Sequence, residues 1–221
     1  MTARNIVTWP DRRLCRPSDP VVSFDEVLLG LVGDMRDTLN VAFGAGLAAP
    51  QIGVSQRVVI IKPDQFTDEM GVEPIVMVNP RVELSGDKVR WEESCLSLPG
   101  VSGVVERSSC ASVNYQDVEG NHHHLDATWP LAGAVQHECD HLEGKVYPMR
   151  MTSWSRNSLQ KKVLKRQKQA REMREARERE MREDLMGARG AKKKHHAPRS
   201  DKDKRRAKQA RKSRRINRRR K

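Results

Sequence analysis

Charge divides this chain into two unequal parts, and the division limits which part can fold as a domain. Residues 1–150 contain 13 Lys and Arg against 21 Asp and Glu, a net charge of −8. Residues 151–221 contain 29 against 8, a net charge of +21. Low-complexity sequence of such charge is typical of disorder. We therefore expect a globular domain over residues 1–150, a charged helix over 151–186 and a disordered polybasic tail over 187–221.

The pattern of apolar residues in the first part predicts an α+β fold. A helix capped by Ser23 is expected, because apolar residues from Asp25 onward follow the helical period. Short β-branched runs predict strands, and Glu119-Gly120-Asn121 predicts a hairpin turn. We expect a mixed or antiparallel sheet packed around a central helix. Its strands are predicted at residues 57–61, 75–78, 82–84, 101–106, 111–116 and 122–125.

The N-terminus lacks the charged start and apolar region of a signal peptide, and no apolar run approaches the roughly 18 residues of a membrane span. Four cysteines in a domain of this size make a poor disulfide framework. We therefore expect a cytoplasmic protein without membrane contact, with reduced cysteines, one of them available to a metal.

Residues 136–144, QHECDHLEG, carry the strongest chemical signal. His137 and His141 stand four residues apart, so on a helix both imidazoles project from one face, as two ligands of one metal must. A metal bound there would lower the pKa of a coordinated water toward about 7. Glu138 lies between the histidines and is the candidate group to take that water's proton and pass it to a leaving amine.

Two histidines leave a catalytic metal site incomplete, because such sites usually have three protein ligands and an open position for water. Of the three cysteines outside the helix, Cys95 is the best candidate for the third ligand. It lies in ESCLSLPG, whose small and turn-forming residues predict an exposed bend. A Cys-His-His site is compatible with Zn²⁺ and with Fe²⁺.

Three segments in this order resemble peptide deformylases of the bacterial type: GAGLAAPQIG at 44–53, CLS at 95–97 and HECDHLEG at 137–144. The resemblance extends from about Ile6 to Pro148. It implies removal of the formyl group from the N-terminal methionine of new polypeptides. It also implies one divalent metal, Fe²⁺ as the active ion, with zinc, nickel or cobalt as substitutes.

Carried over to this sequence, the resemblance implies a role for each matching residue. The Gln51 side-chain amide and the Leu96 backbone N–H would face the formyl oxygen as it becomes an oxyanion. Gly46 would bind the peptide backbone through main-chain hydrogen bonds. The metal ligands would be Cys95, His137 and His141, and the general acid and base would be Glu138.

The chain departs from the family pattern at Ser94, where deformylases usually have glycine. If that glycine needs a positive φ, serine adds strain of roughly 1 kcal/mol or more. If it does not, the change is silent or narrows access for the substrate.

The basic C-terminal part has two interpretations. A helix with glutamates among its arginines can be a solvated helix held by i, i+4 pairs. However, its net charge of +21 exceeds what solubility requires and favours a nucleic-acid partner. The resemblance makes ribosomal RNA the natural candidate, bound through residues 151–221 of a monomer.

Two rival functions and three local interpretations stay open. A zinc endopeptidase shares the HExxH chemistry but would more typically take a third ligand from a downstream helix, and an inactive deformylase-like protein would serve only to bind ribosomes or RNA. Asp140 either orients a ligand or faces solvent. Cys139 is better explained by packing than by metal binding. His122-His123-His124 is either a second metal site or, as we prefer, a polar hairpin arm.

Overall fold

The computed structural model describes residues 3–67, 71–194, 206 and 208–209, and its contacts divide the chain into residues 1–165 and 166–221. The first unit contains one five-stranded antiparallel sheet in the order β1-β2-β3-β4-β5. The α+β class and the antiparallel sheet are therefore confirmed. The strands are β1 (Gly46–Ala48), β2 (Val58–Ile61), β3 (Ile75–Ser94), β4 (Ser102–Gln116) and β5 (His122–Thr128).

Two strands are much longer than the sequence indicated. The runs at 75–78 and 82–84 belong to one strand, β3, and those at 101–106 and 111–116 belong to β4. Pro80 is tolerated inside β3 because it lies in a register shift between Val78 and Arg81, where the ladder is interrupted. The segment 44–53, for which no strand was predicted, also contains an edge strand, β1.

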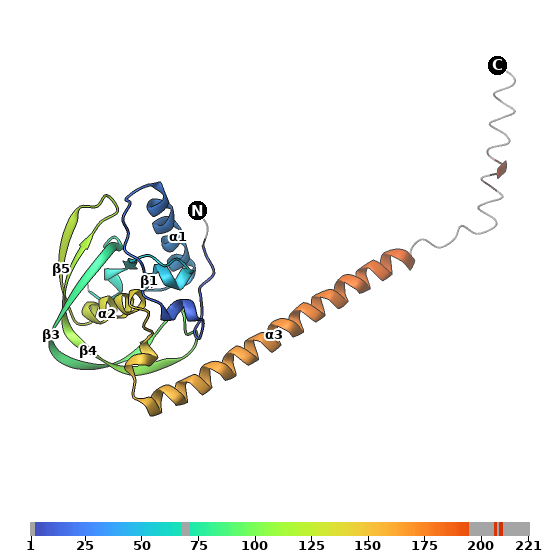
Figure 1. Ribbon diagram of the computed structural model, residues 1–221. Coiled ribbons are helices and arrows are strands. Elements are labelled where there is room, and N and C mark those ends of the chain that lie inside the picture. Colours follow the sequence, from blue (N-terminus) through green and yellow to red (C-terminus); the bar gives the residue numbers. More distant parts are fainter. Residues whose placement is uncertain (1–2, 68–70, 195–205, 207, 210–221) are drawn as a thin grey trace, which may run out of the picture. The chain divides into compact units, whose positions relative to one another are not determined.

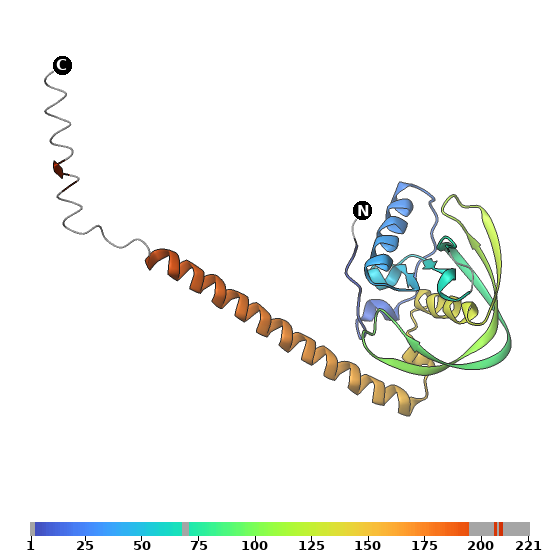
Figure 2. The same cartoon turned by 180° about the vertical axis from the view of Figure 1, so that it is seen from behind.

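The long strands bend around the helix that carries the two histidines. Figures 1 and 2 show α2 (Leu131–Leu142) within the curve of β3, β4 and β5, with α1 (Glu26–Val41) on the other side of β1. An apolar cluster between α2 and the sheet includes Val59, Met77, Val113 and Val135. This packing fixes the position of α2 and hence of its polar face.

The cap of α1 differs from the prediction. The Asp25 carboxylate, not Ser23, accepts hydrogen bonds from the backbone N–H groups of Val27 (3.0 Å) and Leu28 (3.3 Å). Aspartate is a strong N-cap and its charge suits the positive end of the helix, so it takes the position although serine lies two residues earlier. Short 3₁₀ turns connect other elements, at Arg12–Cys15, Ala49–Ile52, Pro63–Gln65 and Tyr147–Arg150.

The charged helix α3 runs over Ser153–Lys194, past residue 186, where the sequence analysis ended it. Residues 191–194 are one Ala and three Lys, which are good helix formers and allow the helix to continue beyond Gly187 and Gly190. Leu159 and Val163 are buried against the domain, each 4% exposed. Most of the predicted disordered tail lies outside the described residues. Among the helices of the described ranges, none is long and apolar enough to cross a membrane.

Candidate active site

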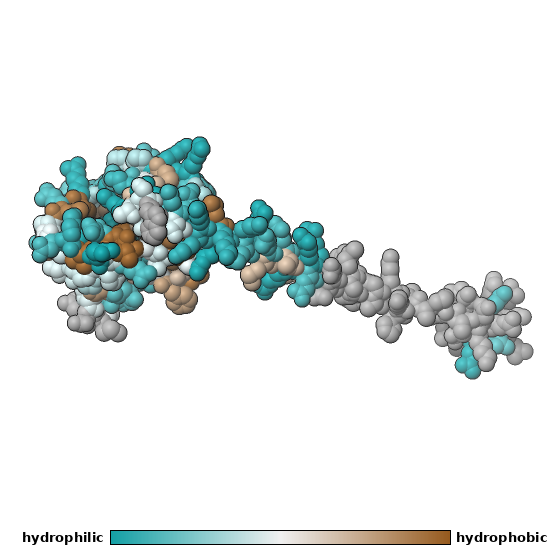
Figure 3. Space-filling view, turned by 90° about the horizontal axis from the view of Figure 1, so that it is seen from below, coloured by the Kyte–Doolittle hydropathy of each residue, from teal (hydrophilic) through white to brown (hydrophobic). Residues whose placement is uncertain are grey.

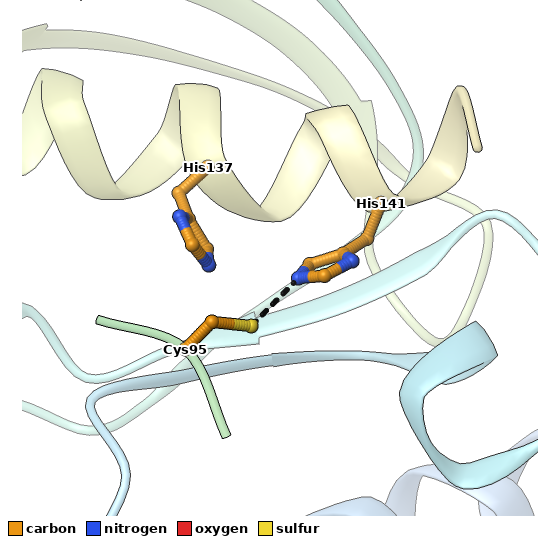
Figure 4. Close-up of side chains that lie close together, drawn as sticks. All are labelled: Cys95, His137 and His141. Carbon is orange, nitrogen blue, oxygen red and sulfur yellow. Dashed lines mark hydrogen bonds between the residues drawn. The ribbon is translucent and has the colours of Figure 1, made fainter. Parts of the chain in front are cut away.

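Cys95, His137 and His141 converge on one point (Figure 4). Their ligand atoms lie within 4.8 Å of one another, and the Cys95 Sγ is 3.3 Å from the His141 Nε2. Within the described residues, no other set of three His, Cys, Asp or Glu side chains converges in this way. A thiolate and two imidazoles suit Zn²⁺ or Fe²⁺, and three protein ligands leave a position open, as in catalytic sites.

Two elements bring these side chains together. His137 and His141 lie one turn apart on the same face of α2. Cys95 follows the last residue of β3 in a turn closed by a 2.9 Å hydrogen bond from the Leu98 N–H to the Cys95 carbonyl. The bend predicted at ESCLSLPG is present and sets the thiol opposite the helix, but it is not exposed, because Cys95, Ser97 and Leu98 are buried.

Glu93 fixes the orientation of His137, a role that the sequence analysis missed. Its Oε2 accepts a 2.7 Å hydrogen bond from the His137 Nδ1, which leaves Nε2 to face Cys95 and a metal. Burial opposes ionisation of Glu93, but hydrogen bonds from Arg107 and His137 lower its pKa to about 2. Strand alternation offered a signal, because residues 93 and 95 share one face of an extended chain.

Arg107 links Glu93 to Asp140 in a buried ion network. Its Nε and Nη2 donate to the two Glu93 oxygens at 2.6 and 2.9 Å, and its Nη1 donates to the Asp140 Oδ2 at 2.6 Å. Asp140 also accepts hydrogen bonds from Arg150. Asp140 therefore does not face solvent, and it acts on His137 only through Arg107 and Glu93.

Glu138 has the environment of a proton-transfer group. Its Oε2 is buried and has no hydrogen-bond partner in the described part of the chain. Burial raises its pKa to about 7, close to the value that suits an acid and base at neutral pH. A Cβ on Gly46 would collide with the Glu138 carboxylate, so glycine at 46 leaves room for this carboxylate in its present position.

The two imidazoles differ electrostatically. Burial disfavours a proton on both, but contact with Cys95 and Glu93 raises the pKa of His137 well above its usual value. Burial and the charge of His137 lower the pKa of His141. A cation that binds both rings has to displace the proton from His137, so metal binding should release a proton.

The Gln51 amide points its N–H groups at the cysteine. Its Oε1 accepts a 2.8 Å hydrogen bond from the Ala48 N–H, and its Nε2 donates to the Cys95 Sγ (3.4 Å) and the Ser97 Oγ (3.3 Å). The bond to Ala48 fixes which end of the amide faces the site. Leu96 follows Cys95 in the turn and is half-buried.

A cleft of about 670 Å³ opens beside these residues. Gly46, Gln51, Cys95, His137 and Glu138 lie in its wall. Ser94 lies at the end of β3, is exposed in the cleft, and has no positive φ. Serine therefore brings no backbone strain here, and its effect is limited to the cleft. The remaining wall is largely apolar and includes Phe43, Phe66, Trp91, Leu98, Val101 and Ala134.

Cys139 and the histidine run at 122–124 lie outside the group of three converging ligands. Cys139 packs in the apolar cluster beneath α2, and burial raises its pKa to about 12, as expected for an inert packing residue. His123 and His124 pair with Asp117 (2.7 Å) and Asp126 (3.1 Å) on the hairpin. Among the described residues, the histidine run is not part of a metal cluster.

Comparison with known proteins gives a consistent result. The family model described as polypeptide deformylase matches residues 3–157. A peptide deformylase from Acidobacterium capsulatum is 38% identical, over 76% of this chain and 98% of its own length. A crystal structure of a peptide deformylase from Legionella pneumophila has a TM-score of 0.70 and 38% identity, with 76% of this chain and 98% of that chain covered. One from Ehrlichia chaffeensis in complex with actinonin has a TM-score of 0.69 and 35% identity, covering 75% and 98%.

Proposed function

The chain belongs to the polypeptide deformylase family and is an enzyme of that type, and from this we propose how it acts. Its substrate is the N-terminal formyl-methionine of new polypeptides, bound in the cleft of about 670 Å³. Cys95, His137 and His141 would hold one divalent metal. The observation that carries the proposal is the convergence of these three ligands beside Glu138, whose Oε2 has no partner within the described residues.

A metal bound by these three residues would act as a Lewis acid that polarises water and the formyl carbonyl. Glu138 takes a proton from the attacking water and gives it to the amine as the formamide C–N bond breaks. The Gln51 Nε2 and the Leu96 backbone N–H donate to the formyl oxygen as negative charge develops on it. Gly46 lies on β1 at the edge of the sheet, where the main chain can pair with the peptide.

The proposed metal is Fe²⁺, for which the Cys-His-His donor set is suitable, as it is for Zn²⁺. The experiment is anaerobic purification of the full chain with metal analysis, followed by an assay on formyl-Met peptides. Turnover that is blocked by actinonin would support the proposal. Absence of turnover in a fully metal-loaded chain would favour the inactive, RNA-binding alternative, and cleavage of internal peptide bonds would favour an endopeptidase.

Cys95→Ser should lose its metal during dialysis against a buffer without metal, because a neutral hydroxyl replaces a thiolate ligand. The matched control is Cys15→Ser, an exposed cysteine outside the cleft, which should keep its metal. Full occupancy in Cys95→Ser would mean that another residue supplies the third ligand.

Ser94→Gly should change kcat/KM less than about threefold, since Ser94 needs no left-handed backbone. A rise of roughly tenfold would mean instead that the hydroxyl crowds the peptide in the cleft. A large fall would contradict both explanations and would give the hydroxyl a positive role. Steady-state kinetics on a series of formyl-Met peptides would distinguish these results.

We further propose that the C-terminal extension tethers the enzyme to ribosomal RNA. The charge is concentrated at its end: residues 166–186 have 7 basic and 6 acidic side chains, whereas residues 187–221 have 18 and 2. In α3, Glu172, Glu175 and Glu178 pair with arginine or lysine at i, i+4, as Glu178 does with Arg174 at 3.0 Å. Figure 3 shows that the coloured part of this helix is mostly hydrophilic. Residues 166–186 of the helix can thus be solvated while residues 187–221, which include its last turns, bind phosphates.

Two truncations test this division. Ending the chain after Met186 removes 18 basic residues and should weaken ribosome binding at least about tenfold. Ending it after Lys168 should have little further effect on binding, and both should keep activity on short formyl peptides because Leu159 and Val163 remain. The binding constant of the full chain should fall with salt. The slope of its logarithm against the logarithm of the salt concentration should be about −0.7 for each single-stranded phosphate neutralised. Equal co-sedimentation of all three chains with ribosomes would refute the tether.

A further inference from the structure

A second cavity, of about 420 Å³, lies among residues of β3, β4 and α2. Six of the 13 Lys and Arg residues of the acidic domain line it, against three of its 21 acidic residues. The cavity is therefore basic within a domain of net charge −8. A concave site of one charge concentrates the electrostatic field and attracts ions of the opposite sign. The six basic residues are Arg57, Arg81, Lys88, Arg107, Lys145 and Arg150.

The carboxylates in the cavity neutralise only part of this charge. Glu143 pairs with Arg57 at 2.7 Å, and Asp140 pairs with Arg107 and Arg150. The third, Glu106, forms no ion pair within the described residues. Together with Glu93, which also pairs with Arg107, these acidic groups leave a local excess of two positive charges.

Several donors remain available to a ligand. Arg81 and Lys145 are exposed and, within the described part of the chain, form no salt bridge. Lys88 donates a 2.9 Å hydrogen bond to the Ser108 Oγ, which uses one of its three N–H groups. In contrast, the Nε, Nη1 and Nη2 of Arg107 are occupied by Glu93 and Asp140. The charge of Arg107 is thus compensated by these two carboxylates, and Arg81, Lys88 and Lys145 supply the charge and hydrogen bonds that a ligand can use.

The cavity also has an apolar wall. Pro80, Val82 and Leu84 line it, and Leu84 is 50% exposed although it is a large aliphatic residue. The volume falls within the range of about 300–1,000 Å³ that is typical of sites for small molecules. Guanidinium and ammonium groups beside apolar side chains suit a small anion with a non-polar body. Phosphate is the anion whose charge and several acceptor oxygens best match the donors of arginine and lysine.

We propose that this cavity is a binding site for a small phosphate monoester, separate from the deformylase cleft. The phosphate binds Arg81, Lys88 and Lys145, and the organic part packs on Val82 and Leu84. The site is independent of the polybasic tail, because all of its residues belong to the unit of residues 1–165.

The test is a titration of the isotope-labelled full chain monitored by backbone amide NMR. Because each residue gives its own signal, shifts in the cavity can be told apart from shifts in the basic tail. The probes are inorganic phosphate and phenyl phosphate. Saturable shifts are expected at residues 81–88, 106 and 145. Tighter binding of phenyl phosphate would identify an ester as the ligand, and equal affinities would identify free phosphate as sufficient.

Arg81→Ala with Lys145→Ala should weaken binding at least about tenfold, because charge-assisted hydrogen bonds to phosphate are lost. The matched control removes two exposed arginines outside the cavity, Arg12→Ala with Arg90→Ala, and should bind as the natural chain does. Shifts confined to residues 187–221, shifts that do not saturate, or equal binding by both double variants would overturn the proposal. Deformylase activity should stay within twofold in both variants, which shows that each is folded.

Discussion

Replacing Glu138 by glutamine is expected to lower kcat on formyl-Met peptides by at least about 10²-fold, because the amide cannot take a proton from water or return one to the amine. Glutamine has the same shape, so the metal content should stay nearly unchanged. The position next to His137 in α2 gives Glu138 access to the metal ligands, and its pKa of about 7 gives it both protonation states near neutrality. Steady-state kinetics with metal analysis on the same preparation is the required measurement.

The control for this variant is Glu119→Gln, which changes an exposed glutamate in the hairpin turn and should keep natural turnover. Natural turnover in Glu138→Gln would exclude Glu138 as the proton-transfer group. Loss of the metal from Glu138→Gln would instead show that the carboxylate helps to hold the metal ligands in place. The two outcomes are distinguished by expressing kcat per bound metal ion.

The three residues that converge at the proposed metal site could be predicted because their signals are local. Two histidines four residues apart define a ligand pair as soon as the segment is helical. The turn residues around Cys95 predict the bend that presents its thiol. The geometry brings all three together within 4.8 Å. Their roles toward a metal and a substrate remain proposals for the experiments above.

The support behind the ligands could not be predicted in the same way. Glu93, Arg107 and Asp140 come from β3, β4 and α2, and only the packing of α2 against the sheet brings them together. The joined strands were missed for a related reason. A proline usually ends a strand because it has no N–H to donate. Pro80 is tolerated because it lies in a register shift, where the ladder needs no donor at that position. Pairing between distant segments decides both features, and a single sequence carries no direct record of it.

Arg107→Met is expected to lower the free energy of unfolding by about 3–5 kcal/mol, the usual cost of removing one partner from a buried ion pair. Arg107 is 3% exposed and is the shared partner of two carboxylates that are almost as buried. Without it, Glu93 would keep only His137 as a partner and Asp140 only the more exposed Arg150, so both buried charges would be less well compensated. Urea denaturation with a chelator present would measure this effect without a contribution from metal release.

The same variant should also release metal faster, since Glu93 would no longer be held where it orients His137. Arg107→Lys should recover part of the stability but not all, because an ammonium group restores the charge without the two-pronged contact to Glu93. Arg90→Met, at an exposed position of β3, is the matched control and should change stability by less than about 0.5 kcal/mol. If Arg107→Met unfolds with the same free energy as Arg90→Met, the buried ions contribute nothing to stability. If Arg107→Met were that stable and still lost its metal faster, the ion network would serve only to orient His137.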